Sequence, residues 1–377
     1  MKTKNLVVGC GISGATIAAK LARDFKEEVM VIEKRNCIGG NCFDYHIENI
    51  LIHKYGPHIF HTNNEKVWKF ISEFTDWHIY MHEVMAVVEG KKVNIPFNLD
   101  SIYEVFPPVL AERIINEAIA KLGYGCKVPI LELFNCENSD LNLLANYIYQ
   151  HVFLHYTSKQ WGKKPEEVDG AVTARVPLNI SRDRRYFQDK YQGIPKDGYT
   201  KLIENMLNNP KIKVFLNTDF KDIKREIEFE RLFYTGPIDE FFEYEFGGLP
   251  YRSIDFKLER IDKPYYQEKA VINYPNNYDF TRITEFKHFQ DTTSEFTYIM
   301  KEFPQQYIPG VNEPYYAITS SESACIYQQY LNKVRSMKNI WFLGRLGDYR
   351  YYDMDDAVER ALTLVETLYS VKENSND

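Results

Sequence analysis

The spacing of hydrophobic and polar positions near the N-terminus changes from strand-like to helical and back. Residues 6–8, LVV, form a short apolar run that is typical of a buried strand. Residues 15–25, ATIAAKLARDF, place their apolar positions at helical spacing, and residues 28–35, EVMVIEKR, return to a strand pattern. The sequence therefore predicts a β-α-β unit at the start of the chain.

Longer patterns predict two further structural regions. Residues 101–123 and 140–162 repeat their apolar positions at helical spacing, so we expect an inserted helical domain there. Between 241 and 336 the chain is dense in aromatic and β-branched residues, which favours an antiparallel sheet. Other segments are predicted to belong to the same domain as the N-terminal β-α-β unit: a helix at 198–209, strands at 211–218 and 230–239, and a strand, loop and helix over 339–370.

The turn after the first strand has the composition of a dinucleotide-binding site. Gly9, Gly11 and Gly14 form a GxGxxG motif, and Glu33 ends the second strand about 20 residues later. In such units the pyrophosphate lies at the helix N-terminus and the acid accepts hydrogen bonds from ribose hydroxyls. A glycine-rich turn without a ligand is the alternative interpretation.

Three later features favour FAD over NAD as the dinucleotide. A Gly-Gly pair at 39–40 follows the second strand, as is frequent in FAD-binding Rossmann proteins. The stretch 233–237, FYTGP, resembles a strand-to-turn motif of the same superfamily, and 344–357, GRLGDYRYYDMDDA, predicts a helix N-terminus directed at a flavin. The chain has no second GxGxxG motif for a nicotinamide nucleotide.

The predicted fold class is therefore α/β, with a Rossmann-like FAD-binding domain, an inserted helical domain and an antiparallel β-sheet domain. The predicted boundaries are 1–80, 196–240 and 337–377 for the FAD-binding domain, 100–175 for the helical domain, and 81–99, 176–195 and 241–336 for the sheet domain.

Charge and composition narrow the possible partners. The net charge of −7 opposes a nucleic-acid partner, because phosphate backbones are held by broad basic surfaces. No apolar run approaches the roughly 20 residues that span a bilayer, and the start, MKTKNLVV, lacks the features of a signal peptide. We therefore expect a cytoplasmic protein without membrane insertion. The 28 tyrosines suit stacking on a nucleobase or a flavin as well as core packing.

Two clusters of reactive side chains allow several interpretations. Cys37 and Cys42 flank the Gly-Gly pair, but without a CxxC motif or a nicotinamide site the six cysteines are expected to be mostly buried, reduced thiols. His58 and His61 stand three residues apart, with His53 upstream. Their spacing alone fits a metal site, a general base, a cofactor pocket or an ordinary core.

A series of motifs resembles the bacterial UDP-galactopyranose mutases. The resemblance extends from about residue 4 to 365 and is carried, in chain order, by HKYGPHIFHTN, NIPFNL, YTSKQWG, YQGIPKDGYTKLIE, YTGPIDEFF, YRSIDFKLER, AVINYP, TRITEFKHF, EPYYAI and GRLGDYRYYDM. Pro57 replaces a common alanine of that family, and RLGD at 345–348 replaces its more common RLAE.

The resemblance implies a flavin-dependent mutase that interconverts UDP-galactopyranose and UDP-galactofuranose without net redox change. In that family N5 of reduced FAD attacks the anomeric carbon, UDP leaves, and the sugar ring opens and recloses. The product would supply galactofuranose for cell-surface glycans. The resemblance also implies a homodimer, with the UDP-galactose substrate bound between the three domains.

The resemblance assigns cofactor contacts to the glycine turn, the histidine motif and the closing motif. The implied contacts are Gly9, Gly11, Ser13, Gly14, Glu33, Lys34, Gly40, Asn41, His58, Ile59, Gly344, Arg345, Asp353 and Met354. His58 is implied to lie beside the reactive ring of the flavin, with His61 supporting it. The implied chemistry needs no metal.

Arg175 and Arg282 match the two diphosphate-binding arginines of the family, and with His58 they form the implied catalytic set. The implied substrate contacts are Tyr156, Thr157, Trp161, Tyr186, Phe187, Asn273, Tyr316 and Tyr351. Trp161 begins the implied mobile loop, and residues 162–170 match its closing lid. The alternative interpretations are core packing for the tyrosines, structural salt bridges for the arginines and an ordinary surface loop for residues 162–170.

Three other functions compete with this one. A flavin oxidoreductase of the amine-oxidase type would share the FAD domain but would need no pyrophosphate clamp. A FAD-binding scaffold would show no turnover. The same mutase chemistry on UDP-N-acetylgalactosamine is also compatible with the motifs. The ordered arginines and tyrosines favour a mutase over the first two.

Overall fold

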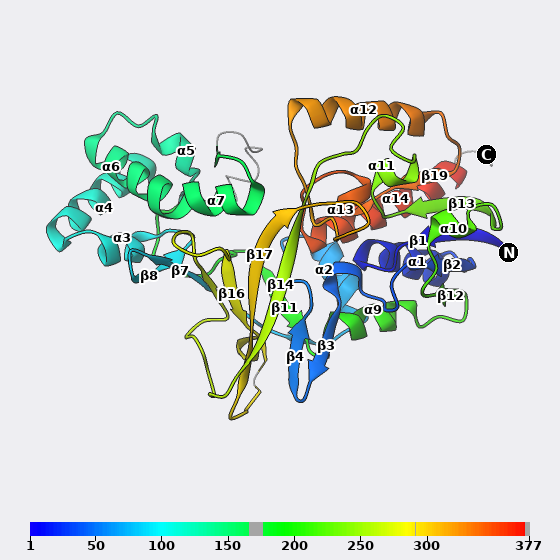
Figure 1. The fold of residues 1–377 in the computed structure, drawn as a ribbon, viewed down its shortest axis with the longest axis horizontal. Helices are drawn as coiled ribbons and strands as arrows, with labels where there is room; N and C mark the ends of the chain where they lie inside the picture. Colours follow the sequence, from blue (N-terminus) through cyan, green and yellow to red (C-terminus); the bar gives the residue numbers. More distant parts are fainter. Residues whose placement is uncertain (166–175, 291, 374–377) are drawn as a thin grey trace.

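The computed structural model describes residues 1–165, 176–290 and 292–373. The chain folds into three parts that lie side by side. A helical part lies at one end of the molecule, a long sheet lies in the middle, and a helix-flanked sheet that contains the N-terminal strand β1 lies at the other end (Figure 1). This arrangement confirms the predicted α/β class.

A five-stranded parallel sheet forms the core of the nucleotide-binding part. Its strands lie in the order β12-β2-β1-β13-β19, and every neighbouring pair is parallel. All four residues of β2 are buried, as expected for a parallel strand covered on both faces. The strands are β1 (Lys2–Val8), β2 (Val29–Ile32), β12 (Ile212–Phe215), β13 (Glu228–Tyr234) and β19 (Ile340–Phe342), and the helices that flank them include α1 (Ile12–Asp24), α9 (Tyr199–Leu207) and α14 (Met354–Glu373).

The helical part fills the region that the apolar periodicity predicted. The 101–123 pattern is split at Pro107, since proline lacks the backbone N–H of a helix interior and is favoured at helix starts. Asn98 and Asn138 cap the helices that follow them by accepting hydrogen bonds from backbone N–H groups. The helices are α3 (Leu99–Val105), α4 (Pro108–Leu122), α5 (Ile130–Leu133), α6 (Ser139–Ile148), a π-helical turn (Tyr149–Phe153) and α7 (Leu154–Trp161).

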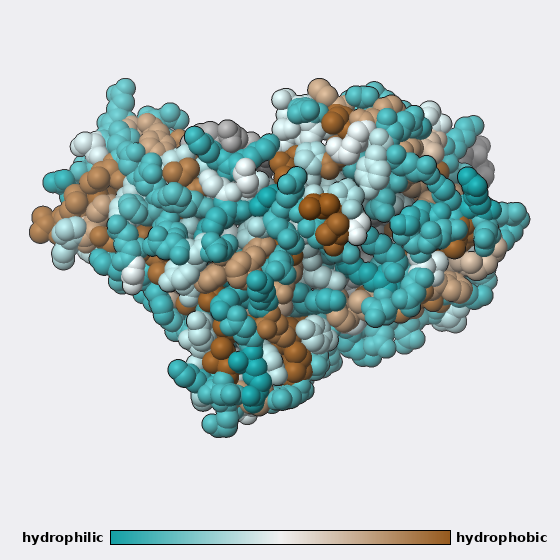
Figure 2. All heavy atoms as spheres, viewed as in Figure 1, coloured by the Kyte–Doolittle hydropathy of each residue, from teal (hydrophilic) through white to brown (hydrophobic). Residues whose placement is uncertain are grey.

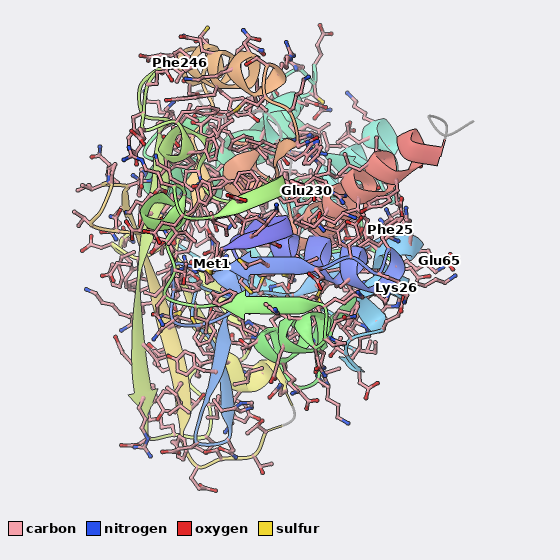
Figure 3. All side chains as sticks on the ribbon, turned by 90° about the vertical axis from the view of Figure 1, so that its right-hand side faces the viewer. Met1, Phe25, Lys26, Glu65, Glu230 and Phe246 are labelled. Atoms are coloured by element: carbon pink, nitrogen blue, oxygen red, sulfur yellow. The ribbon has the colours of Figure 1, made fainter. Side chains whose placement is uncertain are left out.

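A seven-stranded sheet joins the two ends of the molecule, and its order is β18-β14-β17-β16-β15-β7-β8. It is antiparallel except for the pairing of β15 with β7. In the side view, β14 and β17 extend well beyond the five-stranded sheet (Figure 3). The strands are β7 (Val84–Val88), β8 (Lys91–Ile95), β14 (Tyr251–Ile261), β15 (Val271–Asn273), β16 (Arg282–Glu285), β17 (Thr297–Gln306) and β18 (Tyr316–Ala317).

One segment predicted as sheet is a helix. Helix α12 (Ser321–Arg335) begins with a capping box in which Ser320 and Ser323 satisfy each other's backbone N–H groups. The sheet prediction for this segment was therefore wrong. The helix was not recognised because its apolar residues do not stand out from the aromatic sequence around it.

Shorter elements connect the three parts. Residues 176–195 contribute to two small sheets. In one, β10 (Leu178–Asn179) pairs with β9 (Lys127–Val128), and in the other, β11 (Tyr191–Pro195) pairs with β5 (Phe60–Thr62) and β6 (Trp77–His78). The remaining elements of the described segments are β3 (Asp44–Ile47), β4 (Ile50–His53), α2 (Glu65–Ser72), α10 (Phe220–Ile223), α11 (Ile238–Phe241), α13 (Gly344–Gly347) and two 3-10 turns (Gly40–Cys42 and Phe286–Phe289).

Hydrophilic residues cover most of the visible face, and hydrophobic residues form small separate patches (Figure 2). Within the three described segments, no helix combines the length and apolar character needed to cross a bilayer.

Candidate active site

A cavity lies where the nucleotide-binding part meets the seven-stranded sheet and the helical part. Most of the predicted site residues line it: Gly9, Gly11, Ser13, Glu33, Lys34, Gly40, Asn41, His58, Ile59, Tyr156, Tyr186, Phe187, Asn273, Arg282, Tyr316, Gly344, Arg345, Tyr351, Asp353 and Met354. Gly14, Thr157 and Trp161 are not among its lining residues. Arg175 and most of the predicted lid lie outside the described residues.

The glycine turn is built so tightly that side chains would not fit. Gly9 has a φ of +99°, and a Cβ added there would lie 2.0 Å from the Oγ1 atom of Thr235. A Cβ on Gly14 would lie 2.0 Å from the carbonyl oxygen of Gly9. Gly14 therefore shapes the turn from behind, which explains why it does not line the cavity.

Two distant motifs pack against this turn. The N–H of Gly39 donates to the carbonyl of Cys10 at 2.9 Å. Gly40 has a φ of +57°, and a Cβ there would lie 2.8 Å from the Cα of Gly11. A Cβ on Gly344 would lie 3.3 Å from the Oγ of Ser13. The first glycine turn, the Gly-Gly pair and the closing motif thus converge on one place.

Glu33 is held rigidly at the edge of the cavity. One carboxylate oxygen accepts from the N–H of Cys10 at 2.8 Å, and the other accepts from the N–H of Arg35 at 2.9 Å. Each oxygen retains a second lone pair that is available to a ligand hydroxyl.

Arg35 and Glu313 line the same cavity and were not predicted. An Nη atom of Arg35 lies 3.0 Å from a carboxylate oxygen of Glu313, and its guanidinium lies 4.9 Å from the ring centre of Tyr55. This ion pair joins the nucleotide-binding part to the loop before β18. The two residues are 278 positions apart, so no local pattern indicates the pair.

His58 is neutral in this environment. Burial lowers its pKa to about 3, and the nearby His53 ring and the Arg345 charge act in the same direction. Its Nδ1 atom lies 2.9 Å from the carbonyl oxygen of Gly56. Because a carbonyl only accepts, Nδ1 carries the proton and Nε2 is left as a hydrogen-bond acceptor.

His61 supports a different part of the site. Its Nδ1 atom lies 2.8 Å from a carboxylate oxygen of Asp189, and its Nε2 atom lies 3.8 Å from one of Asp353. Its ring stacks on Phe187 with centres 3.6 Å apart. His61 therefore orients the ring of Phe187. Within the described segments, no group of three or more His, Cys, Asp or Glu side chains is arranged to hold a metal ion.

Arg282 reaches the cavity from the start of β16. Its Nε atom lies 2.7 Å from a carboxylate oxygen of Glu302, which is fully buried. Tyr156 lies near this charge, and burial raises the pKa of its phenol although Arg282 opposes the shift. The amide oxygen of Asn273 is buried without a hydrogen-bond partner among the described residues, which fits a donor from a ligand.

Three aromatic rings form a cluster beside Arg282. The ring of Trp161 lies 5.5 Å from that of Tyr316 and 5.6 Å from that of Tyr351, and the two tyrosine rings are 5.4 Å apart. The guanidinium of Arg345 lies 5.1 Å from the centre of Tyr316. Trp161 thus lies behind the two tyrosines and is itself buried.

The six cysteines are all free, but most are not buried. Only Cys10 and Cys42 are buried, Cys37 and Cys136 are half-buried, and the other two are exposed. The expectation of mostly buried thiols was therefore wrong, because several cysteines lie on the outer turns and helix faces rather than in the core. Burial raises the pKa of the Cys10 and Cys42 thiols to about 12.

Comparison with known proteins identifies close similarities. A family model described as UDP-galactopyranose mutase matches residues 151–351, and a model described as an NAD(P)-binding Rossmann-like domain matches residues 7–74. The chain is 36% identical to a probable UDP-galactopyranose mutase of Klebsiella pneumoniae, with 100% of this chain and 98% of that protein covered. It is 35% identical to a dTDP-fucopyranose mutase of Escherichia coli, with 95% and 96% covered.

A solved structure of reduced UDP-galactopyranose mutase superposes with a TM-score of 0.73, at 15% identity and with 98% of this chain and 96% of that chain covered. This likeness concerns the fold. Because the family model covers more than half of the chain and the relatives match nearly all of it, the chain belongs to the UDP-galactopyranose mutase family, as its ordered motifs predicted.

Proposed function

We propose that this chain is a FAD-dependent mutase that interconverts UDP-galactopyranose and UDP-galactofuranose. The observation that carries the proposal is the shared cavity. Three glycine-containing segments that suit a dinucleotide converge there with Arg282 and with the tyrosines that suit a sugar nucleotide. Membership of the mutase family supports the same conclusion.

The residues present fit FAD. The close approach of Gly9, Gly11 and Gly40 leaves bare backbone for a diphosphate, and the fixed carboxylate of Glu33 suits a ribose. His58 and Arg345 would lie on the flavin side of the cavity. Reduced flavin, when bound, supplies the nucleophile that the ring contraction needs.

The chain's own groups would hold and orient the sugar nucleotide. Arg282 uses Nε for Glu302, which leaves its Nη groups for a diphosphate whose negative charge grows as it departs. Tyr316 and Tyr351 present phenol groups beside it. Neutral His58 offers Nε2 as an acceptor to a hydroxyl or N–H. Holding UDP while it is detached keeps it available for recombination.

Arg175 remains the predicted second arginine of the clamp. A substitution Arg175→Ala should abolish turnover and leave FAD bound, because a single guanidinium would then face the departing diphosphate. Measuring the FAD content and the turnover of the reduced variant tests this assignment, and near-normal turnover would exclude it.

The function is tested with the purified protein under anaerobic conditions. We expect a yellow protein that interconverts the two UDP-sugars after dithionite reduction and is inactive with oxidised flavin. Chromatographic separation of the sugar nucleotides measures both directions. Absence of conversion by the reduced protein, or equal conversion by the oxidised protein, would exclude the proposed mechanism.

The similarity to the dTDP-fucopyranose mutase raises a second candidate substrate, because the two identities, 36% and 35%, do not separate the two names. Fucose lacks the C6 hydroxyl of galactose, and thymidine differs from uridine in one methyl and one hydroxyl. A panel of UDP-galactose, UDP-N-acetylgalactosamine and dTDP-fucose, compared by kcat/KM, decides between them. A preference of about tenfold or more for UDP-N-acetylgalactosamine or dTDP-fucose would show that this compound, and not UDP-galactose, is the substrate.

The chain is also proposed to act as a homodimer in the cytoplasm and to supply galactofuranose for cell-surface glycans. Light scattering of the purified holoenzyme tests the dimer, and a monomeric mass at working concentration would exclude it.

A further inference from the structure

Helix α7 is held against the seven-stranded sheet by two cations. Lys159 lies on the helix and Arg252 lies on β14. In the described segments, neither forms an ion pair with a carboxylate, and both bind backbone carbonyl oxygens instead. A charged group used in this way fixes the position of a backbone segment.

Lys159 binds the loop that joins β15 to β16. Its ammonium donates to the carbonyls of Tyr274 at 2.6 Å, Tyr278 at 3.0 Å and Phe280 at 3.1 Å. These bonds use all three donors of the ammonium group. The loop begins after Asn273 and ends at Arg282, so the same contacts fix the ends of both strands that carry these cavity-lining residues.

Arg252 binds the other side of the helix. Its Nε donates to the carbonyl of Gln160 at 3.0 Å, and an Nη donates to the carbonyl of Lys159 at 2.9 Å. Carbonyls in the last helical turn lack intrahelical partners, and a cation there also suits the helix dipole. Arg252 stands opposite Tyr316 in the pairing of β14 with β18.

The helix held in this way carries three residues of the predicted substrate site, Tyr156, Thr157 and Trp161. Tyr156 lines the cavity, and the ring of Trp161 packs against Tyr316 and Tyr351. The two anchors therefore connect these residues to the elements that carry Arg282 and Tyr316.

We propose that Lys159 and Arg252 are positioning residues for nucleotide-sugar binding. Lys159 sets the distance between α7 and the loop that ends in Arg282, and Arg252 sets the position of Trp161 against Tyr316. This inference rests on the proposed function of the cavity. It differs from a general stabilising role because neither residue touches the glycine turns, so FAD binding should not depend on them.

The test compares Lys159→Met and Arg252→Met with two matched controls. Lys92→Met removes a lysine paired with Glu268 on the same sheet, and Arg113→Met removes an arginine paired with Asp140 between helices, both outside the cavity lining. UDP is titrated into each oxidised holoenzyme, and tryptophan fluorescence is recorded. A parallel titration of Trp161→Phe shows how much of the fluorescence change comes from that ring.

We expect Lys159→Met and Arg252→Met to weaken UDP binding about tenfold or more, and the controls to stay within about twofold. FAD content should remain that of the parent in all four. In the reduced enzyme, KM for the sugar nucleotide should rise more than kcat falls. Arg252→Lys keeps the charge but not the two-pronged geometry, and should restore part of the affinity.

If a methionine variant loses FAD or fails to fold, Lys159→Arg or Arg252→Lys is tested in its place. We expect these variants to weaken UDP binding about threefold or more, because neither reproduces the native set of hydrogen bonds. Parent-like UDP affinity in the folded variants at both positions would overturn the inference and leave the proposed function intact. A parent protein that binds no UDP would overturn both.

Discussion

Arg282 and Glu302 are directly opposite residues of the neighbouring strands β16 and β17, and their side chains form an ion pair of 2.7 Å. Burial alone would lower the pKa of Arg282, but the adjacent Glu302 carboxylate raises that pKa well above its ordinary value. The guanidinium therefore stays charged throughout the working pH range. The same ion pair therefore contributes to the stability of the sheet and places a positive charge in the cavity.

This pair predicts separable effects on stability and turnover. Arg282→Ala should lower the free energy of unfolding by about 3 kcal/mol, because it leaves the buried Glu302 carboxylate without its cation. It should also abolish turnover. The double variant Arg282→Ala/Glu302→Gln removes that unpaired charge, so it should recover most of the stability and none of the activity.

Urea unfolding and the anaerobic assay measure these two effects independently. Equal instability of the single and double variants would show that the carboxylate is satisfied in another way. Turnover by either variant would exclude Arg282 from the clamp.

The glycine turn predicts a difference between two glycine substitutions. Gly14→Ala would place its Cβ 2.0 Å from the carbonyl oxygen of Gly9, so the turn must distort. We expect this variant to lose bound FAD. Gly248→Ala is the matched control, since its Cβ would meet its nearest neighbour at 3.9 Å. The flavin absorbance per protein measures the result, and full occupancy in Gly14→Ala would contradict the assigned site.

The glycine turn was predictable from sequence because its geometry depends on local spacing. Gly9 and Gly14 are close in the chain. Gly9 needs a positive φ that few other residues adopt, and Gly14 has no room for a Cβ beside the carbonyl oxygen of Gly9. Motif order supplied the other predicted cavity residues through the family resemblance, but not Arg35 or Glu313. Trp161 illustrates a limit of this approach, because a motif match cannot distinguish a residue that lines a cavity from one that packs behind it.

The contacts that hold the site together were not predictable in the same way. Arg35 and Glu313, and likewise Lys159 and the loop after Asn273, meet only because the three parts of the chain pack together. Helix α12 was missed because its aromatic residues resemble those of the neighbouring strands, whereas its start depends on a capping box at Ser320. Tertiary packing decided the two long-range contacts, whereas α12 begins at a local signal that the surrounding aromatic pattern obscured.

Two buried histidines, His53 and His82, and the half-buried His58 predict a loss of stability in mild acid. Burial is the main cause that lowers the pKa of His53, His58 and His82 from 6.5 to about 3. The folded protein keeps them neutral, whereas the unfolded chain binds protons below pH 6.5. The unfolded state therefore binds more protons in this window, and the free energy of unfolding should fall as pH decreases from 6.5 towards 3.

Urea unfolding at about pH 7 and about pH 5 measures this effect. His82→Phe should reduce the difference between the two free energies. Because the variant is compared with the parent, the contribution of the carboxylates cancels. An unchanged difference in His82→Phe would show that His82 does not titrate as expected.

The anchor at Lys159 predicts that nucleotide affinity falls in mild alkali. Burial lowers the pKa of Lys159 to about 8, and the charge of Asp279 opposes this shift. Above that pH the ammonium loses its proton, so its three carbonyl partners share an uncharged amine with fewer donors.

The pKa values of Arg282 and Tyr156 are both raised, so these groups do not titrate in the same window. UDP titrations at about pH 7 and about pH 9 should therefore show weaker binding at the higher pH in the parent, and little change in Lys159→Arg, whose charge persists. Equal pH dependence in the two proteins would assign the titration to another group.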